Sequence, residues 1–250
     1  MIQAGMRCPR GDEGKEKVRM DKIHERLETG ILLAIAGGFL DAYTYITRGG
    51  VFAYAQTGNM VLLSMRFTRG EWTQALYYFV PITAFTIGII VTEYISRVCA
   101  AQRGDGWRRV VLGVDAAILL VIGLLPASVP NPVVTVTISF ASAMQYNSFR
   151  KVSGLPYATT MCTGNLRSAV DQLCRWWFDH DGQAGKNSFH YFCIIFYFCV
   201  GAALGTACTQ WWGLRAVWAC SLLMALILER LRRQSRMEDA QEQKRDPQKA

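Results

Sequence analysis

Long apolar stretches alternate with short polar segments along most of the chain. The apolar runs cover residues 30–46, 75–95, 110–125, 132–149, 189–212 and 214–228, and charged residues gather at the two ends and in a few loops. Several runs approach the roughly 20 residues that a helix needs to cross the hydrocarbon core of a bilayer. This pattern predicts an all-α integral membrane protein with about six transmembrane helices.

The two ends of the chain differ from the apolar middle. Residues 1–28 mix basic and acidic side chains and lack the apolar core of a cleavable signal peptide. Residues 232–250 are charged, rich in Gln and poor in apolar residues. We therefore expect a disordered N-terminal extension over 1–28, one polytopic membrane domain over 29–231, and a disordered cytoplasmic tail over 232–250. Met20 is an alternative start to Met1.

The tripeptide Thr-Gly-Asn occurs twice, at 57–59 and at 163–165, and each copy interrupts an apolar stretch. The copies lie 106 residues apart, and the same shift aligns Asp41 with Asn147. This spacing predicts an internal repeat with a broken or re-entrant segment in each half. The predicted halves cover about 30–126 and 131–231.

Two topologies fit this arrangement. If both triplet segments cross the bilayer, the chain has eight spans; if each enters and leaves on one side, six spans remain. With six spans, nine Lys and Arg lie in inward loops against four outside, whereas eight spans place eight outside and five inside. Because inward loops are enriched in Lys and Arg, the charges favour six spans with both termini in the cytoplasm.

Three crossings in each half have a structural consequence. The second half is then inserted upside down relative to the first, an arrangement that recurs in transporters with the binding site near the midplane. Irregular backbone at membrane depth is tolerated where it is buried in protein or lines a wet cavity. The sequence thus predicts that the two triplets approach each other from opposite faces.

Each residue type of the triplet suits a helix break. Gly58 and Gly164 permit backbone angles that are closed to other residues, while Thr or Asn can cap the N–H groups of the following helix. Helix N-termini carry partial positive charge, so the paired breaks are able to hold an anion or a polar solute. Alternatively, both triplets are packing hinges, in which small residues let helices approach closely.

Polar and ionisable residues at membrane depth are expensive and usually functional. Asp41 either faces a water-filled cavity or pairs with an Arg, and Asp115 should face other helices. Arg167 either adds positive charge to the second triplet or extends to the membrane interface. The charge-relay or pairing candidates are Arg48, Asp115 and Arg167. The candidate substrate-binding residues are Asp41, Gln56, Thr57, Gly58, Asn59, Asn147, Thr163, Gly164 and Asn165.

Other chemistry has no support in the sequence. The chain has no Gly-rich phosphate loop, no H-E-x-x-H motif and no CxxC pair among its eight cysteines. We therefore expect no catalytic residues, metal or cofactor, and no enzyme activity. The net charge of +8 is explained by membrane orientation and anionic lipid head groups, so we expect no nucleic-acid partner.

Several segments resemble a known family. Residues 38–43 (GFLDAY), 50–52 (GVF) and 56–59 (QTGN) resemble the YoaK-like bacterial membrane proteins, grouped as domain of unknown function 1275 (DUF1275, UPF0700). Residues 159–166 (TTMCTGNL) are similar to the second signature of that family. The resemblance covers about 30–230 and implies a multi-pass protein of the bacterial inner (plasma) membrane with unknown activity. It supplies no substrate.

Two functions remain open at this point. The first is a small-solute transporter or channel whose site lies between the two breaks. The second is a membrane scaffold or regulatory protein that moves no solute and acts through its charged ends and loops. In either case the lipid bilayer is the expected environment, a small polar or anionic solute is the expected partner of a transporter, and a homo-oligomer is compatible with the sequence.

Overall fold

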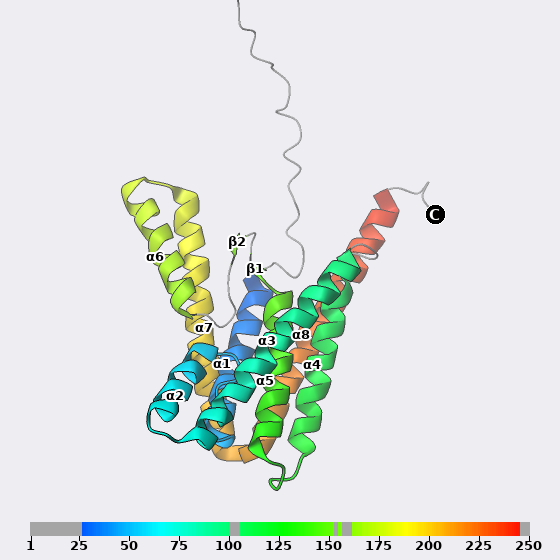
Figure 1. Cartoon of the computed structure of the whole chain (residues 1–250). Coiled ribbons are helices and arrows are strands. Elements are labelled where there is room, and N and C mark those ends of the chain that lie inside the picture. Colours follow the sequence, from blue (N-terminus) through cyan, green and yellow to red (C-terminus); the bar gives the residue numbers. More distant parts are fainter. Residues whose placement is uncertain (1–26, 101–105, 153–154, 157–161, 246–250) are drawn as a thin grey trace, which may run out of the picture.

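A computed structural model of the chain describes residues 27–100, 106–152, 155–156 and 162–245, almost all of them helical (Figure 1). Most of the predicted N-terminal extension lies outside the described residues. A two-stranded antiparallel hairpin adds a minor element to the predicted all-α fold, with β1 at Lys151–Val152 and β2 at Leu155–Pro156. The helices are α1 (Leu27–Thr47), α2 (Gln56–Thr68), α3 (Trp72–Ala100), α4 (Gly106–Leu124), α5 (Asn131–Ser148), α6 (Cys162–Phe178), α7 (Gly182–Trp212), the 3-10 turn η2 (Gly213–Ala216) and α8 (Val217–Arg245).

Each of the six apolar runs corresponds to one long helix: α1, α3, α4, α5, α7 and α8. Two helices extend well beyond their runs, because α7 begins at Gly182 and α8 continues to Arg245. Within the described residues, three helical stretches are long and apolar enough to cross a membrane, at Leu27–Thr47, Trp72–Cys99 and Gly182–Met237. The last stretch contains both α7 and α8. The helices predicted from the apolar pattern are therefore present, whereas the number of crossings stays a prediction.

The long helices pack in pairs that are far apart in the sequence. α1 packs against α7, α3 against α5, and α4 against α8, while α2 and α6 each form a hairpin with the helix that follows (Figure 1). Glycines allow the closest approaches. A Cβ at Gly201 of α7 would overlap the Ile35 backbone of α1, and one at Gly88 of α3 would lie 2.6 Å from the Phe140 carbonyl oxygen of α5.

Two helices are markedly shorter than the rest. α2 has 13 residues and α6 has 17, which correspond to lengths of about 20 Å and about 26 Å at a rise of about 1.5 Å per residue. Figure 1 shows both on the same side of the bundle, running from their facing starts toward opposite ends. The triplet Thr-Gly-Asn lies at the start of each.

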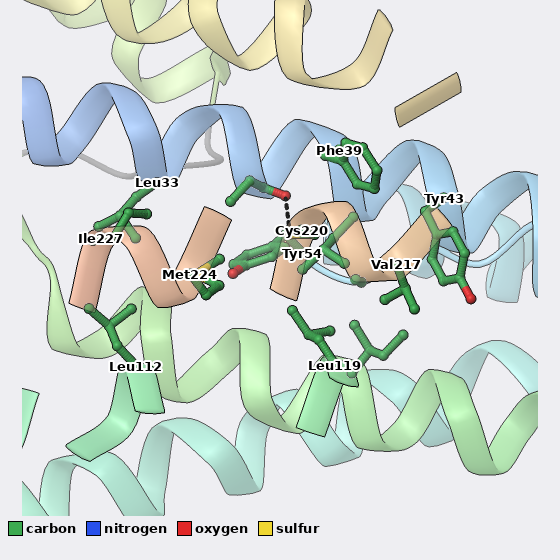
Figure 2. Close-up of a cluster of buried hydrophobic side chains, with 14 of the residues drawn as sticks. Leu33, Phe39, Tyr43, Tyr54, Leu112, Leu119, Val217, Cys220, Met224 and Ile227 are labelled. Carbon is green, nitrogen blue, oxygen red and sulfur yellow. Dashed lines mark hydrogen bonds between the residues drawn. The ribbon is translucent and has the colours of Figure 1, made fainter. Parts of the chain in front are cut away.

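The core lies between α1, α4 and α8. Leu33 and Phe39 of α1, Leu119 of α4 and Met224 of α8 are all buried there. Figure 2 shows the ring of Tyr54 among these side chains, next to Cys220 and Met224. Tyr54 belongs to the loop between α1 and α2, so a loop residue fills the centre of the helical core.

The structure departs from the expected disordered tail. α8 continues through residues 232–245, most of the stretch for which the sequence predicts disorder. This part of the helix is rich in Arg, Gln, Glu and Met, which are good helix formers. An ion pair of 2.7 Å between Arg233 and Glu229, four residues apart, adds support to the helix surface.

Candidate functional site

The first triplet fills the first turn of α2. The helix begins at Gln56, and its N-cap is Ala55, which has no side-chain cap. Asn59 instead reaches back to the loop: its Oδ1 accepts from the Phe52 N–H at 2.9 Å, and its Nδ2 donates to the Phe52 carbonyl at 2.8 Å and to the Gln56 Oε1 at 2.9 Å. The predicted capping by Thr57 or Asn59 is therefore wrong, because the helix starts ahead of the triplet. Asn59 ties the preceding loop to the helix, and Thr57 is exposed.

The glycines of the triplets do not adopt special backbone angles. Gly58 and Gly164 are both helical, and neither is among the glycines with positive φ. Gly58 is needed for space, because a Cβ there would lie 2.8 Å from the ring of Phe52. No described atom lies within 4 Å of the corresponding position at Gly164. The prediction of unusual angles at these glycines is wrong, since both lie inside a regular helical turn.

Asp41 supplies the polar partner that the start of α2 lacks. Its Oδ1 accepts hydrogen bonds from the Tyr54 N–H at 2.7 Å and the Ala55 N–H at 3.3 Å. Asp41 is 4% exposed, and its Oδ2 has no hydrogen-bond partner in the part of the chain that the structure describes. No described Arg forms an ion pair with it. The positive end of α2 and the two amides compensate the carboxylate in place of a counter-ion.

The second triplet occupies the same place in α6. That helix begins at Cys162, so Asn165 is its fourth residue, as Asn59 is the fourth of α2. Both asparagines are buried, while Thr163 and Gly164 are exposed. Cys162 lies close enough to Asp41 for the two side chains to interact electrostatically. Asp41 is therefore hydrogen-bonded at the start of α2 and within electrostatic range of the first residue of α6.

Tyr54 connects Asp41 to a second set of buried polar side chains, which lie on α5 and α4. Its hydroxyl donates to the Gln145 Oε1, and Ser142 and Asp115 lie close enough to interact with it. Gln145 and Ser142 belong to one face of α5 that is polar although buried. That face carries Thr135, Ser139, Ser142 and Gln145, each 1% exposed or less.

Several buried atoms of this cluster have no hydrogen-bond partner among the described residues. They are both carboxylate oxygens of Asp115, the hydroxyls of Ser139 and Ser142, the Nε2 of Gln145 and the Oδ2 of Asp41. Buried polar atoms almost always form hydrogen bonds, and a group of exceptions needs an explanation.

The other predicted residues lie in different networks. Asn147 donates to the Ile89 carbonyl at 3.5 Å and accepts from Arg150, which also pairs with Glu93 at 2.6 Å. Arg48 is 1% exposed and donates to the Tyr43 hydroxyl at 3.3 Å, whereas Arg167 is exposed. The structure thus brings Asp41, Gln56 and Asn59 together around the start of α2, and places Asn147 and Arg48 in other networks.

Sequence reasoning missed the members of the cluster apart from its acids. Tyr54 carries no local signal, because its role depends on how a loop folds back into the bundle. The α5 residues do carry one: Thr135, Ser139, Ser142 and Gln145 recur at spacings of three and four, which marks one helix face. A polar stripe inside an apolar run is the signal that would have found them.

Comparisons with known proteins agree with a membrane location. The model of the family described as "Protein of unknown function (DUF1275)" matches residues 29–228. The UPF0700 transmembrane protein YoaK of Bacillus subtilis (strain 168) is 24% identical over 148 residues, which make up 57% of this chain and 64% of that protein. The match thus spans less than two thirds of that relative. No solved structure matches the chain.

Proposed function

The chain belongs to the DUF1275 family, and on that premise we propose that it is a multi-pass transporter or channel for a small polar solute. It has six spans, and its site lies between two inverted halves, near Asp41. Both termini face the cytoplasm, and the membrane is the bacterial inner membrane. The observation that carries this proposal is the position of Asp41, which is buried, accepts hydrogen bonds from the backbone just before α2, and lies within electrostatic range of Cys162 at the start of α6.

The packing of the helices supports two related halves. If α1–α4 and α5–α8 exchange places, the contact of α1 with α7 becomes that of α5 with α3, and the hairpin of α2 and α3 becomes that of α6 and α7. The contact of α4 with α8 maps onto itself. Such an exchange is what a pseudo-two-fold axis between inverted repeats produces.

The dimensions of the helices support six spans. α2 is about 20 Å long, shorter than a hydrocarbon core of about 30 Å, and it starts inside the bundle (Figure 1). The beginning of α1 and the later part of α8 lie together, because Glu28 pairs with Arg230. An even number of crossings follows, with the described ends of the chain on one side.

The chemistry of the cluster narrows the solute class. Two buried carboxyl groups, Asp41 and Asp115, and the two hydroxyls of Ser139 and Ser142 provide mainly acceptors, and Gln145 provides a donor. A small cation or a neutral solute with several N–H or O–H groups satisfies these atoms better than an anion. Tyr54 closes the cluster from the loop before α2, so movement of that loop is the step that admits the solute.

Flux through proteoliposomes tests the transport proposal. The full chain is reconstituted and the uptake of radiolabelled methylammonium, glycerol and phosphate is measured. We expect uptake of methylammonium or glycerol above that of protein-free vesicles, and a loss of at least about tenfold in Asp41→Asn, because the amide keeps the hydrogen-bond acceptor but removes the charge. Arg167→Ala is the matched control and should transport normally. Flux that is unchanged in both Asp41→Asn and Asp115→Asn overturns the site.

Cysteine labelling tests the topology independently of the solute. Single cysteines replace Arg69, Ser128 and Gly182 on a Cys-depleted background, and a membrane-impermeant maleimide is added to intact cells. Six spans predict labelling at positions 69 and 128 and protection at 182. Eight spans place all three positions on the protected side, and that result overturns the inverted-repeat arrangement.

A scaffold or regulatory role remains the second candidate, favoured by the continuation of α8 as a charged helix to Arg245. Truncation after Arg233 separates the two functions. A transporter should retain its uptake after this truncation, since the cluster lies elsewhere, whereas a scaffold should lose its cellular role.

A further inference from the structure

A groove with a basic end runs between α4 and α8, which pack side by side (Figure 1). It encloses about 620 Å³ near the start of α4 and the later part of α8. Its polar lining consists of Arg109 from α4 and Arg232, Ser235 and Arg236 from α8. Gly106 and Gly113 of α4 also line it, and their lack of side chains keeps the space open.

Within the described residues, no carboxylate forms an ion pair with the three arginines of this groove, Arg109, Arg232 and Arg236. Their neighbours on α8 do: Arg230 pairs with Glu28, and Arg233 pairs with Glu229. Glu229 also interacts electrostatically with Arg232 and Arg236, but its ion pair is with Arg233. Excess positive charge therefore remains on the side of α8 that faces α4.

The basic groove continues as an apolar one. A second groove of about 410 Å³ shares Val114 and Ala117 with the first and extends along α4 to Leu125, bordered by Val133 and Val134 of α5. The distance along α4 from Arg109 to Val121 is about 18 Å at a rise of about 1.5 Å per residue. One leaflet of the hydrocarbon core is about 15 Å thick. The apolar groove is thus long enough for an acyl chain.

The basic end lies at the depth of the lipid head groups. Trp107 stands in the first turn of α4, and the guanidinium of Arg108 lies 4.8 Å from the centre of its ring. Indole rings prefer the membrane interface. Arginine is also the side chain whose planar fork best matches phosphate oxygens. Head-group phosphate and groove arginines therefore meet at one level.

We propose that the α4–α8 groove binds an anionic phospholipid of the surrounding bilayer, with its phosphate on Arg109, Arg232 and Arg236 and one acyl chain along α4. A soluble phosphate fits the three arginines but leaves the apolar continuation unused. A lipid with no net charge fits the apolar part but leaves the arginines unneutralised. An anionic phospholipid satisfies both parts.

Native mass spectrometry of the detergent-purified full chain tests this assignment, with phosphatidylglycerol, phosphatidylcholine and inorganic phosphate as probes. The chain should bind phosphatidylglycerol at least about tenfold more tightly than phosphatidylcholine, since each arginine near a phosphate adds affinity. Arg232→Ala/Arg236→Ala should remove this preference. Arg230→Ala/Arg233→Ala removes the same charge from the same helix but lies outside the groove, and it should keep the preference.

Filling the apolar groove tests the acyl chain. Ala117 is exposed in both grooves, so Ala117→Trp fills them with little effect on folding, which monodispersity in detergent checks. This variant should also bind phosphatidylglycerol about tenfold less tightly. Equal losses in the two arginine variants would show a general effect of charge and overturn the site. Displacement of phosphatidylglycerol by inorganic phosphate, with no effect of Ala117→Trp, would show a site for a soluble anion and overturn the lipid assignment.

Discussion

The two short helices start with the same triplet but differ in what stands before them. Before α2, the α1 residue Asp41 accepts hydrogen bonds from the Tyr54 and Ala55 amides through its carboxylate. In α5, the residue 106 positions later is Asn147, which bonds Ile89 and Arg150 instead. The buried fourth residue, Asn59 or Asn165, is common to both. The triplet therefore occupies the same positions in both helices, while the buried acid stands only before α2.

In the long helices, the buried polar residues lie in the second half rather than in the first. The buried face of α5 carries Ser139, Ser142 and Gln145, whereas the positions 106 residues earlier in α1 are Leu33, Ala36 and Phe39. The first half contributes two acids and a tyrosine to the central cluster, and the second half contributes hydroxyls and an amide. In the proposed inverted repeat, a site built from such unlike contributions would suit an asymmetric solute.

The largest effect is expected where the helices pair across the halves. Gly201→Val places a branched side chain against the Ile35 backbone, which cannot move without separating α1 from α7. Overpacking of a tight contact costs about 1–3 kcal/mol, and a backbone neighbour puts this variant at or above about 3 kcal/mol. Thermal unfolding in detergent measures it. Gly88→Ala in the α3–α5 contact should cost less, because it adds only a methyl group and the nearest backbone atom is farther away, at 2.6 Å from the new Cβ against 2.1 Å at Gly201. Equal losses would contradict the difference between the two contacts.

Loss of Asp41 should lower the free energy of unfolding more than loss of Asn147, the residue 106 positions later. Asp41→Ala leaves two buried amides without an acceptor, so the free energy of unfolding should fall by about 2–3 kcal/mol. Asn147→Ala loses one long hydrogen bond and one contact with the half-exposed Arg150, and should cost about 1 kcal/mol or less. Thermal melts of both purified variants give the comparison. If Asn147→Ala lowers the free energy of unfolding more than Asp41→Ala, the hydrogen bonds that stabilise the bundle most lie around Asn147 and not around Asp41.

Much of this arrangement could be predicted from the sequence, and the remainder could not for physical reasons. Apolar runs locate the six long helices because burial in lipid or in the bundle demands them. The ion pair of Glu93 and Arg97, at 3.1 Å, can be read from their spacing of four residues because its geometry is local. The position of Tyr54 and the amide contacts of Asp41 depend on a loop that folds back into the bundle, and no periodic pattern encodes such a path.

Loss of the hydrogen bonds between Asn59 and the loop before α2 should have a smaller effect on the free energy of unfolding. Asn59→Ala removes two hydrogen bonds to the Phe52 backbone and one to Gln56, and should lower the free energy of unfolding by about 2 kcal/mol. Asn59→Asp keeps the acceptor for the Phe52 N–H but turns a donor into an acceptor facing the Phe52 carbonyl. It should therefore be no more stable than Asn59→Ala in the same melt. A stable Asn59→Asp would show that the loop does not depend on the amide.

The smallest changes in the free energy of unfolding are expected at Gly58 and Gly164, and they should have opposite signs. In Gly58→Ala the new methyl group meets the Phe52 ring at 2.8 Å, so the ring must shift and the variant should lose up to about 1 kcal/mol. Gly164→Ala meets no described atom and gains helix propensity, so it should gain up to about 1 kcal/mol. Paired melts resolve the sign even where the sizes are small. Because both glycines are helical, a loss at Gly164 would mean that α6 is packed as tightly at its start as α2, and the two triplets would then be equivalent in packing as well as in position.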